Sequence, residues 1–217
     1  MLNREKGLHI LRIAGSIFFF LFSVLVLIFA IEIAFLYLTI WGVIITTIYF
    51  ILAVCLSRNQ KLRLATEALF TGLWTINWTI TIIYWCYIFP LITDNVYVTF
   101  LFHGLPLIFT IGEFCLNDFQ ILRKYYLIPA IIELLYFILN IITTEVTKST
   151  IYPGINYVNA ITYIILIVVL IIFASSLEIG RLLKIKVNRY WRNKTRENNS
   201  TFGEQLVFNN MDTSTVQ

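Results

Sequence analysis

The amino-acid sequence predicts an all-α fold: a polytopic bundle of six transmembrane helices with both termini in the cytosol. Of the 217 residues, 59% are hydrophobic and only 13% are charged, which leaves too little polar surface to cover a soluble globule of this size. The apolar residues gather into runs about 20 residues long, the length of a helix that crosses a hydrocarbon core about 30 Å thick. These two observations exclude a water-soluble fold.

Short polar segments separate the expected spans. The apolar run after Arg12 is longer than the roughly 7 to 15 apolar residues of a cleavable signal peptide, so we expect it to be retained as the first span. Pro90 and the polar Asp94 end the third. The six expected spans are residues 13–31, 37–56, 67–89, 97–116, 126–142 and 157–177.

The positive charges fix the expected orientation. With the amino terminus in the cytosol, 15 of the 16 Lys and Arg residues lie on the cytosolic side and only Lys148 lies outside, as the positive-inside rule requires. Residues 1–180 then form the membrane domain, and residues 181–217 form a basic juxtamembrane segment and a cytosolic tail. The tail after Arg196 is rich in Asn, Ser and Thr, so we expect it to be disordered.

The composition also excludes several kinds of site. The basic residues flank the apolar runs, which indicates membrane topology and no nucleic-acid partner. Cys55, Cys86 and Cys115 show no metal-ligand spacing and are interpreted as packing thiols. The chain has only two histidines, and His9 lies in the cytosolic leader. Paired haem ligands and His-rich metal clusters are therefore excluded, and no cofactor or metal is expected.

Four ionisable residues fall inside the expected spans or at their edge: Glu32, His103, Glu113 and Glu133. Such residues are costly in a bilayer and are functional candidates by default. Thr39 begins the second span and His103 lies about six residues into the fourth, so both are near the outer surface and can meet. A threonine needs such a base to act as a nucleophile. The alternatives are a Thr39 hydroxyl bonded to its own helix and an imidazole that bridges two helices. From its depth alone, Glu32 is a candidate for orienting the imidazole. Glu113 is expected to pair with Arg123 or Lys124 or to cap a neighbouring helix.

Short motifs in the same order resemble the androgen-induced protein family, which includes the androgen-dependent TFPI-regulating protein and is akin to the rolling stone proteins. They are Tyr37-Leu-Thr-Ile-Trp-Gly42, Thr47-Ile-Tyr-Phe50, Phe102-His-Gly104, Glu113 and Tyr152-Pro153. The likeness covers about residues 10 to 180. It implies a six-span hydrolase of fatty-acid esters of hydroxy fatty acids, with Thr39 as nucleophile and His103 as the catalytic histidine. The chain departs from the animal members at Leu105 and Pro106, where they have a second His and a Thr.

The sequence therefore predicts a multi-pass membrane hydrolase of lipid esters with Thr39 and His103 as its catalytic residues. Its expected partners are membrane lipids and a lipid-ester substrate, and its expected location is the endoplasmic reticulum or another endomembrane more than the plasma membrane. The alternative is a non-enzymatic membrane protein, such as an adaptor, a fusion-related protein or a small transporter. In that case His103 and Glu113 would serve helix packing or proton movement.

Overall fold

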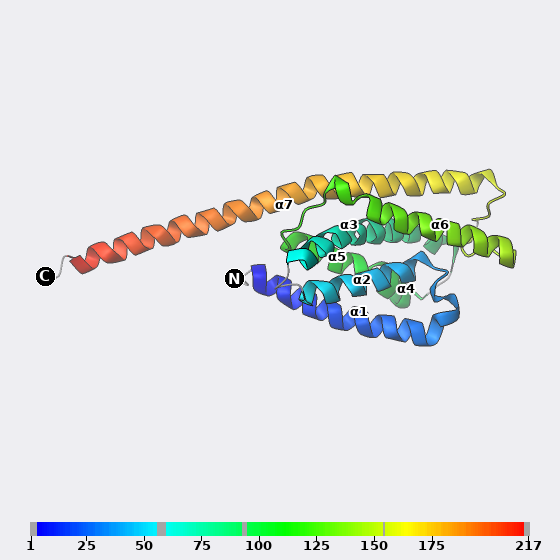
Figure 1. The fold of residues 1–217 in the computed structure, drawn as a ribbon, viewed down its shortest axis with the longest axis horizontal. Helices are drawn as coiled ribbons and strands as arrows, with labels where there is room; N and C mark the ends of the chain where they lie inside the picture. Colours follow the sequence, from blue (N-terminus) through cyan, green and yellow to red (C-terminus); the bar gives the residue numbers. More distant parts are fainter. Residues whose placement is uncertain (1–3, 56–59, 93–94, 154, 215–217) are drawn as a thin grey trace.

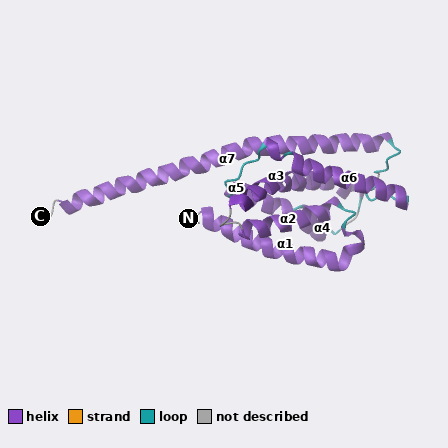
Figure 2. Ribbon diagram, viewed as in Figure 1, coloured by secondary structure: helices purple, strands orange, loops and turns teal. Residues whose placement is uncertain are grey.

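The computed structural model describes residues 4–55, 60–92, 95–153 and 155–214, with the backbone alone for Ile33, residues 60–61 and residues 196–214. All regular elements in these ranges are helical (Figures 1 and 2). The elements are α1 (Arg4–Ala34), α2 (Leu38–Cys55), α3 (Gln60–Ile83), the π-helix η2 (Tyr84–Ile88), the 3-10 helix η3 (Phe89–Leu91), α4 (Val96–His103), α5 (Leu105–Leu116), the 3-10 helix η4 (Arg123–Tyr125), α6 (Leu127–Thr147) and α7 (Ala160–Ser214).

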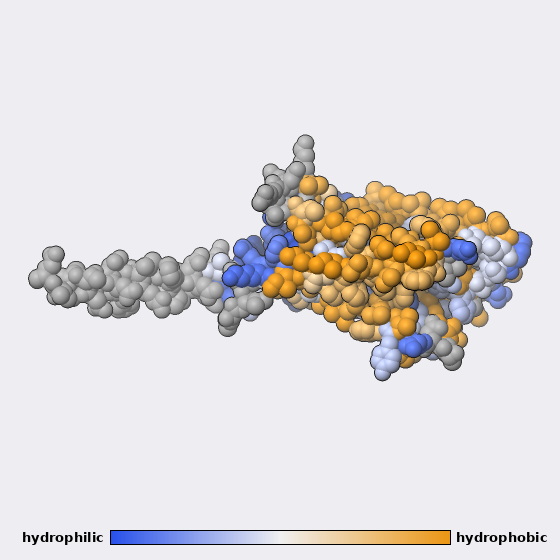
Figure 3. Space-filling view, turned by 90° about the horizontal axis from the view of Figure 1, so that it is seen from below, coloured by the Kyte–Doolittle hydropathy of each residue, from blue (hydrophilic) through white to orange (hydrophobic). Residues whose placement is uncertain are grey.

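The described chain contains five segments that are long and apolar enough to cross a membrane. Hydrophobic residues cover the sides of the bundle, and hydrophilic residues gather at its ends (Figure 3). This is the surface that a lipid environment selects, and the protein is therefore a multi-pass integral membrane protein. The segments are Arg4–Glu32, Leu38–Cys55, Val96–Leu116, Arg123–Thr147 and Ala160–Thr195.

Helix α3, the expected third span, is not among these five. It carries several threonines and Asn77, which lower its mean hydropathy. The helix lies at the centre of the bundle, in contact with α2, α5, α6 and α7, and all of residues 70–77 are buried. Several of its polar side chains have partners inside the protein: the Asn77 amide donates to the hydroxyls of Thr110 (2.8 Å) and Thr46 (3.2 Å). A helix enclosed by protein does not need an apolar surface.

The expected fourth span is divided in two at Gly104. Pro106 follows in the first turn of α5. Because proline has no amide hydrogen, it cannot donate to the carbonyl of Phe102, four residues earlier, and its ring crowds that carbonyl. The division places His103 at the last position of α4, beside the start of α2.

Helix α7 is longer than the expected sixth span and extends far beyond the bundle (Figure 1). The expected boundary between residues 180 and 181 falls inside this helix, whose backbone stays helical to Ser214 through the region where composition predicts disorder. A nucleated helix adds further turns at little cost, so a polar segment can continue it. The side chains of residues 196–214 and the whole of residues 215–217 lie outside the described part of the chain.

The cysteines are not packing residues as expected. Cys55, Cys86 and Cys115 are all free and exposed on the bundle surface. An exposed thiol in an apolar helix behaves as a small hydrophobic side chain against lipid. A buried cysteine and a lipid-facing cysteine therefore have the same apolar neighbours in the sequence. By contrast, Trp74 is buried, stacks on Phe114 with ring centroids 4.1 Å apart, and donates its indole N–H to the Ser176 carbonyl.

Candidate functional site

Thr39 and His103 lie in contact. Thr39 is in the first turn of α2 and His103 is the last residue of α4, and the distance from Thr39 Oγ1 to His103 Nδ1 is 3.4 Å. This is the long end of the hydrogen-bond range, as is common for catalytic pairs without a bound substrate. The contact expected from the depth of the two residues in their spans is therefore present.

The imidazole of His103 is held in place by α3 and the π-helix that follows it. The Tyr84 ring stacks on the imidazole, with centroids 3.4 Å apart and planes 8° from parallel. The Thr81 hydroxyl donates to the His103 carbonyl (2.6 Å), which fixes the backbone at the end of α4. Tyr84 belongs to η2, and such π-helical turns inside longer helices are frequent at functional sites. One contact holds the plane of the imidazole and the other holds its backbone, and together they keep the ring beside Thr39.

A cavity of about 380 Å³ lies at the Thr39–His103 pair. Its other walls come from the turn before α2, from α4 and from the segment before α7, and include Tyr37, Phe102 and Tyr152. The volume falls in the range of small-molecule sites, which are mostly apolar with a few polar groups. A substrate in this cavity would reach the Thr39 hydroxyl and the imidazole together.

A hydrogen-bonded tyrosine pair anchors the start of α2, and the sequence analysis missed its role. The hydroxyls of Tyr136 and Tyr152 are 2.9 Å apart. Tyr136 donates to the Leu36 carbonyl (2.9 Å), and the Leu38 amide donates to Tyr152 (3.2 Å). Burial raises the pKa of the Tyr152 hydroxyl, which keeps it protonated. The pair positions Thr39 by fixing the residues just before it. The sequence hint to this pair is Tyr152-Pro153, which is one of the motifs of the family resemblance and has no role assigned to it.

Three other polar residues near the start of α2 have different surroundings. Glu32 is exposed at the end of α1. The structure therefore gives no support to the expectation that it orients the imidazole. The Trp41 indole N–H donates to the Phe35 carbonyl (3.0 Å) and is therefore engaged elsewhere. Tyr37 lines the cavity and is the better placed of the two as a donor to a developing oxyanion.

Glu113 is paired with Arg12, not with Arg123 or Lys124 as expected. Its side chain is fully buried, and Arg12 Nη2 lies 2.6 Å from its Oε1. The same oxygen accepts hydrogen bonds from the Tyr49 hydroxyl (2.7 Å) and the Asn117 amide (3.2 Å). These contacts satisfy the carboxylate, which is a structural link between α1, α2 and α5 and not part of the Thr39 site.

The site contains the groups that acyl transfer requires: a hydroxyl, an imidazole within reach of it, and a cavity for the ester. Within the described residues, no group of three or more His, Cys, Asp or Glu side chains is arranged to hold a metal ion. Comparison with known proteins adds no further assignment: no family model, no curated protein and no solved structure matches this chain.

Proposed function

We propose that the protein is a multi-pass membrane hydrolase of lipid esters, with Thr39 as nucleophile and His103 as general base. The observation that carries the proposal is the 3.4 Å contact between the Thr39 hydroxyl and the imidazole in the wall of a cavity. The apolar surface of the bundle gives esters dissolved in the bilayer access to the protein. The resemblance of short motifs to the androgen-induced protein family implies the same two roles.

The chemistry follows from the geometry. His103 Nδ1 takes the proton of the Thr39 hydroxyl as Oγ1 attacks the ester carbonyl, and the same proton passes to the departing alcohol. The acyl group is then held on Thr39 as an ester. Water, activated by the same imidazole, attacks this ester and releases the fatty acid. The Tyr37 hydroxyl in the cavity wall is the proposed donor to the oxyanion.

Labelling with a broad fluorophosphonate probe in native membranes tests this proposal. The probe should modify the Thr39 side chain, and peptide mapping should find the adduct there. Labelling should be lost in Thr39→Ala and His103→Ala at matched expression, because the first variant lacks the nucleophile and the second lacks its base. An adduct on any other residue of the wild-type protein would show that Thr39 is not the nucleophile.

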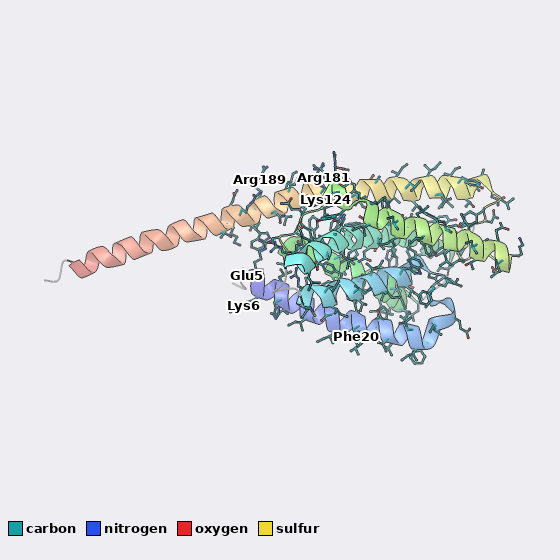
Figure 4. All side chains as sticks on the ribbon, viewed as in Figure 1. Glu5, Lys6, Phe20, Lys124, Arg181 and Arg189 are labelled. Atoms are coloured by element: carbon teal, nitrogen blue, oxygen red, sulfur yellow. The ribbon has the colours of Figure 1, made fainter. Side chains whose placement is uncertain are left out.

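The proposal includes six spans, with α3 as the central one, and both termini in the cytosol of an endomembrane such as the endoplasmic reticulum. Two features support this topology. Positive charges are concentrated on one side of the expected spans. In addition, Lys6, Lys124, Arg181 and Arg189 all lie toward the same end of the bundle (Figure 4).

Glycosylation mapping tests the orientation. Asn193 lies in an Asn-Lys-Thr acceptor sequence, and we expect it to stay unmodified because the tail faces the cytosol. Lys148→Asn creates an acceptor with Ser149 and Thr150 on the opposite side. Lys148 has φ 54°, a left-handed conformation that asparagine adopts readily, so the variant should fold and gain one glycan. A glycan on the wild-type protein that disappears in Asn193→Gln would reverse the proposed orientation.

A further inference from the structure

A second, smaller chamber lies next to the cavity at the Thr39–His103 pair. Its volume is about 70 Å³, and its lining comes from α2, α3, η2, α6, the segment before α7, and α7. Its lining is mostly apolar, with Ile80, Phe137 and Val169 among its residues. Thr39 and Tyr84 line both spaces. The chamber has room for a few methylene-sized groups, and such groups would lie beside the Thr39 hydroxyl.

Among the described residues that line this chamber, Glu133 on α6 is the one with a carboxyl group. The residue is only 4% exposed, and its Oε1 atom has no hydrogen-bond partner. The Thr79 hydroxyl on α3 lies beside the carboxyl group but forms no well-aligned hydrogen bond. A buried polar atom left without a partner is rare in proteins and needs an explanation, above all within a membrane.

Glu133 differs from two other buried polar side chains of the bundle, whose polar atoms have partners. Glu113 is satisfied by Arg12, Tyr49 and Asn117. Asn140, which lines the same chamber as Glu133, accepts a hydrogen bond from the Tyr157 hydroxyl and donates one to Tyr136. Of the two buried carboxyl groups among the described residues, Glu133 is therefore the one with an unpartnered oxygen, and the residue lines a space next to the proposed nucleophile.

We propose that the chamber binds a short apolar part of the lipid substrate that carries a hydroxyl group, and that Glu133 forms a hydrogen bond with this hydroxyl. The proposal rests on the proposed hydrolase function, because it places the ester at Thr39 and the remainder of the lipid in the larger cavity. The apolar walls select the hydrocarbon, and the carboxyl group selects the hydroxyl. Glu133 is then a specificity-determining residue.

A pair of photoactivatable lipid esters tests this assignment. The two probes differ only in one hydroxyl group on the acyl chain near the ester, and crosslinking is measured in the full-length protein carrying Thr39→Ala, so that turnover is not needed. We expect the hydroxylated probe to crosslink about 10-fold more strongly, the difference that one hydrogen bond to a carboxyl group provides. Glu133→Leu should bring the ratio close to one. The control Glu145→Gln, at an exposed residue of the same helix, should leave it unchanged.

Stability distinguishes this role from a structural one. Leucine removes the unpaired oxygen and suits an apolar chamber, so Glu133→Leu should match or exceed the parent in thermal stability. Equal crosslinking of the two probes in the parent protein, or an unchanged ratio in Glu133→Leu, would overturn the assignment. If the ratio depends on Glu133 but the wild-type protein hydrolyses neither ester, the binding site stands and the hydrolase proposal fails.

Discussion

Thr39→Ala is expected to lower the rate of lipid-ester hydrolysis by at least about 1,000-fold, because the variant lacks the atom that forms the acyl-enzyme. Thr39→Ser keeps a hydroxyl at the same position and should retain activity within about 10-fold of the wild type. The rates are compared in purified protein with a panel of long-chain esters. The loss should appear in kcat, since the Thr39 side chain contributes little to the apolar binding surface.

Thr75→Ala is the matched control for this experiment. Thr75 is buried in α3 and its hydroxyl donates to the Thr71 carbonyl of its own helix (2.9 Å), so it represents an ordinary threonine of a membrane helix. Its replacement should leave hydrolysis unchanged. If Thr39→Ala and Thr75→Ala behave alike in a protein that is correctly inserted, Thr39 has a packing role, and an adaptor or transporter becomes the better interpretation.

Arg12→Met is expected to destabilise the protein by about 3 to 5 kcal/mol, the usual effect of removing one partner of a buried ion pair. The Glu113 side chain is fully buried and lies 2.6 Å from the Arg12 guanidinium. Without that cation, the carboxylate keeps only the hydrogen bonds of Tyr49 and Asn117. Thermal unfolding in detergent should show a large fall in the midpoint temperature.

The double variant Arg12→Met/Glu113→Gln should recover most of this loss. Glutamine carries no charge, and its carbonyl oxygen can still accept the hydrogen bonds of Tyr49 and Asn117. Removing both charges of a buried pair is often close to neutral, whereas removing one is not. A double variant as unstable as Arg12→Met alone would show that the two charges are not coupled. As a control, Arg63→Met breaks an exposed pair with Asp118 and should cost no more than about 1 kcal/mol.

The helical elements and the Thr39–His103 contact were accessible from the sequence because both depend on position along the chain. Span length follows from the thickness of the bilayer, and the depth of a residue follows from the rise per residue. Thr39 and His103 lie at similar depths from the same expected surface, and a contact between them needs only neighbouring helices. Which helices are neighbours is not given by depth, so the contact was an expectation and not a deduction.

The surroundings of Glu113 and Glu133 were not accessible, because they depend on the rotation of each helix and on packing across the bundle. Depth indicates Arg123 or Lys124 as partners of Glu113, while packing brings Arg12 to it. The central position of α3 is also invisible to hydropathy, which measures suitability for lipid and not for a protein interior. The polar network around Asn77 could be identified only once the helices that surround α3 were placed.

The enclosure of α3 also affects how the chain is made. The ribosome releases α3 before α5, α6 and α7, although these helices provide much of its cover. Until they are present, the Asn77 amide lacks its Thr110 partner and keeps only the longer hydrogen bond to Thr46 of α2, in a medium that offers few others. Stable insertion of α3 therefore belongs to a late stage of biogenesis, and an incomplete chain would expose to quality control the polar helix that the finished bundle conceals.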